Sequence, residues 1–67
     1  MNGFGERLRE LRLERNLSSV QLGKELGVSG PTIIRWENET ILPTIEKLFN
    51  IAKFFGVTSD FLIGLED

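Results

Sequence analysis

Residues 18–38 read SSVQLGKELGVSGPTIIRWEN, which contains two short helical patterns around a single turn. Ser18, followed by Gln21 three residues later, is the capping-box arrangement that begins a helix. Gly27 supplies the left-handed residue that commonly ends one. The first pattern therefore predicts a helix over residues 19–26.

The second pattern begins after Ser29. Pro31 falls in the first turn of this helix, where its missing N–H group removes no hydrogen bond. Ile33 and Trp36 then continue an apolar face at helical spacing. This pattern predicts a helix over residues 30–38.

An apolar set crosses the turn between these two helices, and Gly23 lies where a side chain would obstruct their close approach. The set comprises Leu22, Leu26, Val28, Ile33 and Trp36. Two short helices locked at a steep angle leave the start of the second one projecting, in a form that fits the major groove of DNA. An ordinary helical hairpin has the same spacing, so spacing alone leaves both interpretations open.

Outward from this stretch, periodicity and capping residues predict three more helices. Phe4 and Leu8 recur at helical spacing in the first, with Asn2 as a candidate N-cap. Thr44 and Thr58 are candidate N-caps of the other two. We therefore predict one compact all-α domain of five helices over residues 1–67. The outer three are expected at 4–15, 45–55 and 59–63.

Composition excludes several classes of site. The 67-residue chain has no cysteine and no histidine, so disulfides, thiol nucleophiles and the usual zinc ligands are absent. We expect no metal and no cofactor. No apolar run approaches the ~20 residues that cross a bilayer, and no signal peptide opens the chain, so a cytoplasmic location is expected. An enzyme with a small-molecule substrate is not expected, because a helical chain this short rarely encloses a catalytic pocket.

The charge balance does not favour nucleic-acid binding. Eight Lys and Arg residues against ten Asp and Glu residues give a net charge of −2. Domains that bind nucleic acid are more often basic. A domain with this net charge can nevertheless carry a basic face, so the balance does not exclude DNA as a partner.

Residues over nearly the whole chain share a pattern more specific than helix spacing. They are Leu11-Arg12, Asn16 to Ser18, Gln21 to Gly23, Leu26 to Ser29, Ile33, Trp36 to Asn38, Leu42-Pro43 and Ala52 to Val57. The most specific part is the Ile-x-x-Trp-Glu-Asn segment that ends at Asn38. In these residues the chain closely resembles the lambda-repressor-like family, the helix-turn-helix domains of the Cro/repressor and xenobiotic-response-element type.

The resemblance implies a five-helix fold in which the second and third helices form the helix-turn-helix. It implies sequence-specific binding of double-stranded DNA as a dimer, regulation of transcription, and a bacterial or phage setting. Carried over position by position, it places base contacts at Ser29, Gly30, Pro31 and Arg35. It places phosphate contacts at Ser19, Thr32 and Asn38. It also implies a structural ion pair between Arg12 and Glu37.

Departures from the family pattern concentrate on the DNA-facing surface, and two interpretations compete there. In the first, Pro31 contacts a thymine methyl group, Gly30 lets the backbone come close, and Arg35 binds guanine. In the second, an apolar patch docks a protein or another copy of this chain. That patch would comprise Val20, Ile34 and Ile41. Regular caps beside an unusual recognition surface are also typical of a designed domain. Natural sequence divergence can produce the same combination, so the sequence leaves both origins open.

Dimerisation would involve the far end of the domain. The candidate side chains are Phe49, Phe54, Ile63 and Leu65. The same side chains are equally suited to covering the core.

Overall fold

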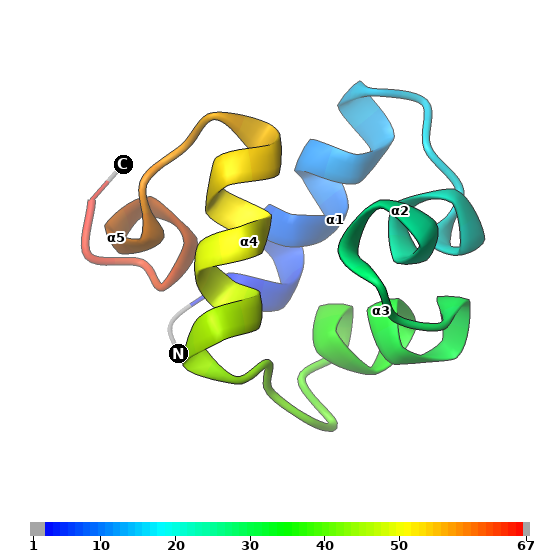
Figure 1. Ribbon diagram of the computed structural model, residues 1–67. Helices are drawn as coiled ribbons and strands as arrows, with labels where there is room; N and C mark the ends of the chain where they lie inside the picture. The colour runs from blue at the N-terminus through cyan, green and yellow to red at the C-terminus, as the bar shows by residue number, and fades with distance from the viewer. Residues whose placement is uncertain (1–2, 67) are drawn as a thin grey trace.

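The computed structural model describes residues 3–66, which form five α-helices and no strand (Figure 1). The helices are α1 (Phe4–Glu14), α2 (Ser19–Leu26), α3 (Gly30–Glu37), α4 (Ile45–Phe55) and α5 (Ser59–Leu62). The predicted all-α fold is confirmed. Each predicted boundary agrees to within one residue, because the last residue predicted for three helices is in each case the C-cap. No helix in the part of the chain described is long and apolar enough to span a membrane.

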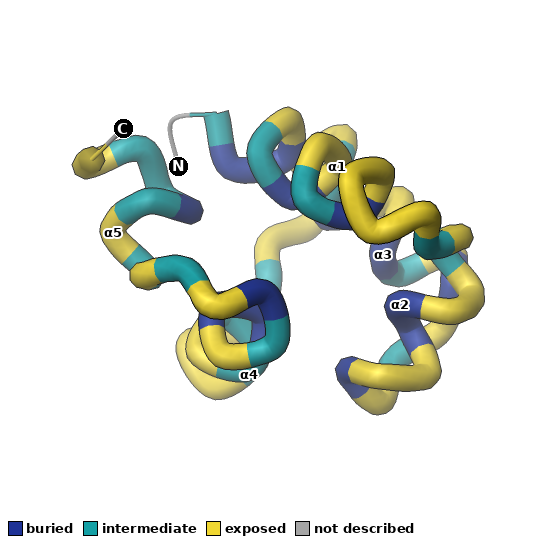
Figure 2. The backbone as a smooth tube through the Cα atoms, turned by 90° about the horizontal axis from the view of Figure 1, so that it is seen from above, coloured by how far each residue is buried: buried dark blue, intermediate teal, exposed yellow. Residues whose placement is uncertain are grey.

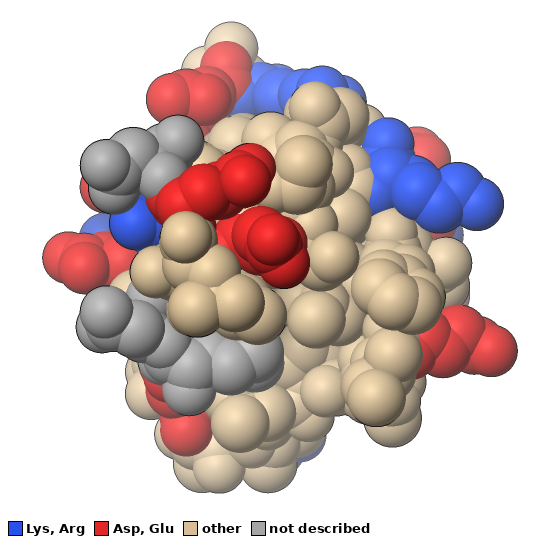
Figure 3. Space-filling view, turned by 90° about the vertical axis from the view of Figure 1, so that its left-hand side faces the viewer, with Lys and Arg blue, Asp and Glu red and all other residues tan. Residues whose placement is uncertain are grey.

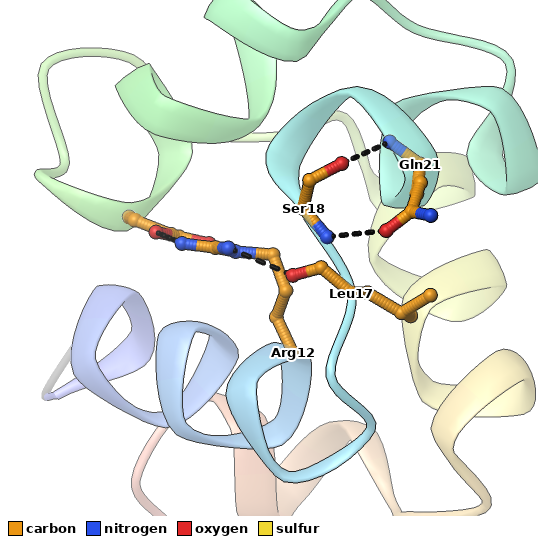
Figure 4. Close-up of polar contacts among 5 residues, drawn as sticks. Arg12, Leu17, Ser18 and Gln21 are labelled. Carbon is orange, nitrogen blue, oxygen red and sulfur yellow. Dashed lines mark hydrogen bonds and ion pairs between the residues drawn. The ribbon is translucent and has the colours of Figure 1, made fainter.

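Serine and threonine side chains begin four of the five helices, as the sequence predicts. The Ser18 hydroxyl accepts a bond from the Gln21 N–H at 3.0 Å, and the Gln21 side chain accepts one from the Ser18 N–H at 2.8 Å (Figure 4). The other three capping residues are Ser29, Thr44 and Thr58. The exception is α1, whose N-cap is Gly3 without a side-chain bond, while Asn2 lies outside the described residues.

The hydrophobic core lies between the inward faces of the five helices. In Figure 2, buried stretches of α1, α2, α3 and α4 turn toward the middle of the domain. The buried apolar residues are Phe4, Leu8, Leu22, Leu26, Ile33, Trp36, Ile51, Ala52, Phe55 and Leu62. Every helix contributes to this set, so none of the five can be removed without exposing core surface.

A buried ion pair joins α1 to α3, as the resemblance implies. The Arg12 guanidinium donates to both carboxylate oxygens of Glu37, at 2.6 and 3.0 Å, and to the Leu17 carbonyl oxygen at 2.9 Å (Figure 4). The two charged side chains are only 10% and 6% exposed. The hydrogen bond to Glu37 raises the pKa of Arg12 above its already high ordinary value, so its charge persists at any working pH.

Gly23 sets the distance between α2 and the start of α3. An ideal Cβ at this position would lie 2.5 Å from the carbonyl oxygen of Val28 and 3.1 Å from the carbonyl carbon of Ser29. Both atoms belong to backbone and cannot swing aside. Gly27 then reverses the chain with a φ of 73°, a conformation that glycine adopts without strain. The predicted close approach at Gly23 is confirmed.

Breaking the ion pair should destabilise the domain strongly. Arg12→Met leaves the Glu37 carboxylate buried without a cation, which costs about 3–5 kcal/mol in such sites. The double variant Arg12→Met/Glu37→Leu should recover most of this loss, since no unpaired charge remains. Urea denaturation of the three proteins checks the prediction. Equal destabilisation of the single and double variants would show that packing, and not charge, accounts for the loss.

Gly23→Ala should also lower stability, against the ordinary preference of helices for alanine over glycine. The added methyl group must displace the backbone at the start of α3, at a cost of about 1–3 kcal/mol. Lys24→Ala, an exposed change in the next residue, is the matched control for urea denaturation. A Gly23→Ala protein as stable as the control would contradict the role assigned to this glycine.

Candidate nucleic-acid interface

The start of α3 projects at the surface with two hydroxyl groups bonded to each other. The Ser29 hydroxyl accepts from the Thr32 N–H at 3.2 Å and lies 2.9 Å from the Thr32 hydroxyl. Ser29 and Pro31 are exposed, and Thr32 is half-buried. The capping bond holds these groups in place, so the first turn of α3 offers a rigid polar end to a ligand.

An exposed stripe runs along α3 at helical spacing. Its members are Pro31, Ile34, Arg35 and Asn38, three or four residues apart and therefore on one face. The core residues Ile33 and Trp36 occupy the opposite face. No hydrogen bond or ion pair among residues 3–66 engages the Arg35 guanidinium. Arg35 is thus an exposed five-donor group on the outward side of α3.

Asn38 has its side chain fixed by the residue two positions later. The Asn38 Oδ1 accepts from the backbone N–H of Thr40 at 3.0 Å and also from the Thr40 hydroxyl. Both bonds use the amide oxygen, so the amide nitrogen remains as a donor. A donor in this position suits a phosphate oxygen.

The N-terminal ends of α2 and α3 meet at Gly30. An ideal Cβ on Gly30 would lie 3.3 Å from the backbone nitrogen of Val20 and 3.4 Å from the Ser19 hydroxyl. Ser19 is half-buried at this junction. The positive ends of the two helix dipoles therefore lie close together, an arrangement that favours an anion.

Gly30 itself does not fit the role predicted for it. The residue is buried, and its missing side chain leaves room for α2, with Val20 Cγ2 only 2.9 Å from the ideal Cβ position. The sequence suggested that Gly30 lets DNA approach the backbone. The close neighbour is instead the first turn of α2, which covers the side of Gly30 where a Cβ would stand.

The carboxylates nearest to α3 are drawn away from the exposed stripe. Glu37 is paired with Arg12, and Glu39 Oε2 accepts from the Gly5 N–H at 3.0 Å at the start of α1. Glu39 takes a left-handed φ of 58°, which the sequence did not predict. The first turns of α2 and α3 contain no acidic residue. The negative net charge is therefore carried elsewhere.

Figure 3 shows the side formed by α4 and α5, which differs from the exposed stripe of α3 in its charges. Uncharged atoms predominate there, and Asp and Glu side chains lie near its centre. A shallow hollow lies between α4 and the turn to α5. Its lining includes Phe49, Lys53, Val57 and Thr58. This side of the domain is largely uncharged, with acidic rather than basic side chains near its centre.

The three residues of the predicted apolar patch are all exposed. Val20 is 54% exposed, and Ile34 and Ile41 are each 44% exposed. Ile34 belongs to the outward stripe of α3, while Ile41 lies in the loop before α4. The patch therefore shares its surface with Arg35.

Known proteins share both the sequence pattern and the fold described above. The helix-turn-helix family model matches residues 8–62. The HTH-type transcriptional activator BcrR of Enterococcus faecalis is 42% identical over 64 residues, which are 96% of this chain and 31% of BcrR. The HTH-type transcriptional regulator MJ0272 of Methanocaldococcus jannaschii is 41% identical over 61 residues, or 91% of this chain and 92% of that protein. The chain thus spans about a third of the length of BcrR.

Among solved structures, the P22 c2 repressor shares the fold. Its crystal structure, in complex with a synthetic operator, matches with a TM-score of 0.88 at 32% identity, over 94% of this chain and 96% of that chain. Nothing in these comparisons supports the interpretation of a designed domain. The chain belongs to the helix-turn-helix family, in its lambda-repressor-like form.

Proposed function

We propose that this domain binds double-stranded DNA in a sequence-specific manner, with α3 in the major groove, as the DNA-reading part of a transcription regulator. The observation that carries the proposal is the exposed stripe of α3, where the Arg35 guanidinium has no partner among residues 3–66 and the carboxylates of Glu37 and Glu39 are bonded to α1. The repressor with the same fold was crystallised with an operator. Such a regulator acts on DNA in the cytoplasm, in a bacterial or phage setting.

Individual side chains take distinct roles in this proposal. Arg35 binds the O6 and N7 atoms of guanine, the contact that a guanidinium makes best in the major groove. Pro31 contacts a thymine methyl group, and Ser29 reaches a base edge from the start of the helix. Phosphate contacts come from the α2–α3 junction and the end of α3. They are made by Ser19, Thr32 and Asn38.

We further propose that two copies bind together as a homodimer. Ile45 and Phe49 lie one turn apart on α4 and are 72% and 52% exposed. Phe49 also borders the hollow between α4 and α5. Leu65 is 72% exposed, whereas Phe54 packs against the core. Phe49 and Leu65 are therefore the better dimer candidates of the four named from the sequence.

Selection from a randomised duplex pool at two salt concentrations tests the DNA-binding proposal. The chain should enrich a defined motif, and its affinity should fall as salt rises. The slope of log K against log salt should be shallow, because the proposed phosphate contacts come from uncharged side chains and few cations neutralise phosphates. Absence of enrichment at low salt would overturn the proposal.

Arg35→Ala should relax the base preference at one position by about 1–3 kcal/mol while leaving the other positions of the motif unchanged. The reason is that the guanidinium contacts one guanine and few phosphates. Lys53→Ala, which removes one positive charge from the end of α4, is the matched control. Repeating the selection with both variants gives the measurement. An unaltered motif for Arg35→Ala would remove this residue from the base contacts.

Phe49→Asp should weaken the dimer by about tenfold or more, since it places a charge in the proposed apolar interface. Analytical ultracentrifugation over a concentration series measures the effect. Leu13→Asp is the control, because Leu13 on α1 is exposed to a similar extent, 49% against 52%. Equal effects of the two changes would argue against an interface at α4.

A further inference from the structure

Two apolar side chains on α3 are exposed and lie outside the buried core. Pro31 and Ile34 lie three residues apart on the outward stripe, and Ile34 is 44% exposed. The core face of the same helix is supplied by Ile33 and Trp36. The exposed part of the Ile34 side chain is therefore apolar surface that a ligand can cover.

Val20 extends this apolar surface from α2. Its Cγ2 atom lies 2.9 Å from the position that a Cβ of Gly30 would occupy, closer than two side chains normally approach. The Val20 methyl group thus takes the space above the first residue of α3 that a side chain of α3 would otherwise fill. Positions 30 and 34 share one helix face, so this methyl group lies about one turn from Ile34. The exposed residues Val20, Pro31 and Ile34 together form what we call the apolar strip.

The surroundings of the apolar strip indicate what it contacts. Arg35 lies on the same stripe of α3, and Asn38 follows one turn later. The neighbouring carboxylates, Glu37 and Glu39, are held inward by Arg12 and by the start of α1. The strip is therefore continuous with the surface proposed to read DNA, and no free carboxylate of α3 faces it.

Base edges in the major groove offer one apolar group, the C5-methyl group of thymine. We propose that the apolar strip is a specificity determinant that binds thymine methyl groups next to the guanine bound by Arg35. Val20 and Ile34 thereby enlarge the apolar contact at Pro31, and the small residue at position 30 is what admits Val20. This inference rests on the proposed function, because it requires α3 to enter the major groove.

Replacement of thymine by deoxyuridine tests the inference, because it removes the methyl group and keeps every hydrogen-bonding atom. The probe is the duplex enriched by the unaltered protein, with one thymine changed at a time. At one or more positions within about two base pairs of the Arg35-dependent guanine, affinity should fall about fourfold, the ratio expected for one buried methyl group. In Ile34→Ser or Val20→Ser, the same replacement should have little further effect at the thymine that the altered side chain contacts.

Leu13→Ser is the matched control, since it removes a similarly exposed apolar side chain from α1. It should keep the full fourfold response to deoxyuridine. The readout is the coupling between the protein change and the base change, which a loss of folding stability alone does not produce. Thermal unfolding of each variant confirms that folded proteins are compared.

Three outcomes would overturn the inference. The first is a motif that depends on Arg35 but is bound with the same affinity when deoxyuridine replaces thymine at any position. This outcome would contradict the inference without contradicting the proposed function. The second is an Ile34→Ser protein that binds DNA unchanged but loses self-association, which would assign the strip to a second copy of the chain. The third is a protein that enriches no motif, in which case the proposed function fails as well.

Discussion

The buried ion pair of Arg12 and Glu37 holds three segments of the domain together. It ties the last turn of α1 to the end of α3, and through the Leu17 carbonyl oxygen it also holds the segment that leads into α2. A buried ion pair adds little net stability compared with apolar residues of equal volume. Its effect here is geometric, because the guanidinium bonds to both carboxylate oxygens of Glu37 and so orients α3 against α1. The direction in which α3 presents its outer face follows from that arrangement.

The charges of the chain show why a count of acidic and basic residues misleads for a domain of this size. Arg12 and Glu37 cancel each other in the interior, and Glu39 is bonded to the start of α1. Among the basic residues, Lys47 donates to a carbonyl oxygen at the end of α2, and Arg15 donates to two carbonyl oxygens at the end of α4. These groups are committed to helix ends and helix contacts, although a carbonyl partner leaves their charge in place. The field at the outer face of α3 depends on which charged side chains lie exposed there, Arg35 among them.

Pairs of residues explain departures from the family pattern better than single positions do. Gly30 has no side chain at the start of the recognition helix, and Val20 is an apolar residue that is 54% exposed on α2. The structure joins these two departures, since the methyl group of one fills the space left by the other. Glu39 likewise adopts a left-handed φ of 58° and accepts a hydrogen bond from the distant Gly5 N–H.

The helices, their boundaries to within one residue and the family resemblance can all be predicted from the sequence, because caps and periodicity depend on residues only a few positions apart. The outward members of α3 can be predicted in the same way, with Gly30 as the exception. The three-dimensional arrangement was needed to show that Gly30 is buried, that the apolar Ile45 is exposed, and that Glu39 reaches Gly5, 34 residues away. These features could not be predicted because burial and long-range hydrogen bonds depend on how whole helices pack. No local pattern encodes which distant residue will lie opposite a given side chain.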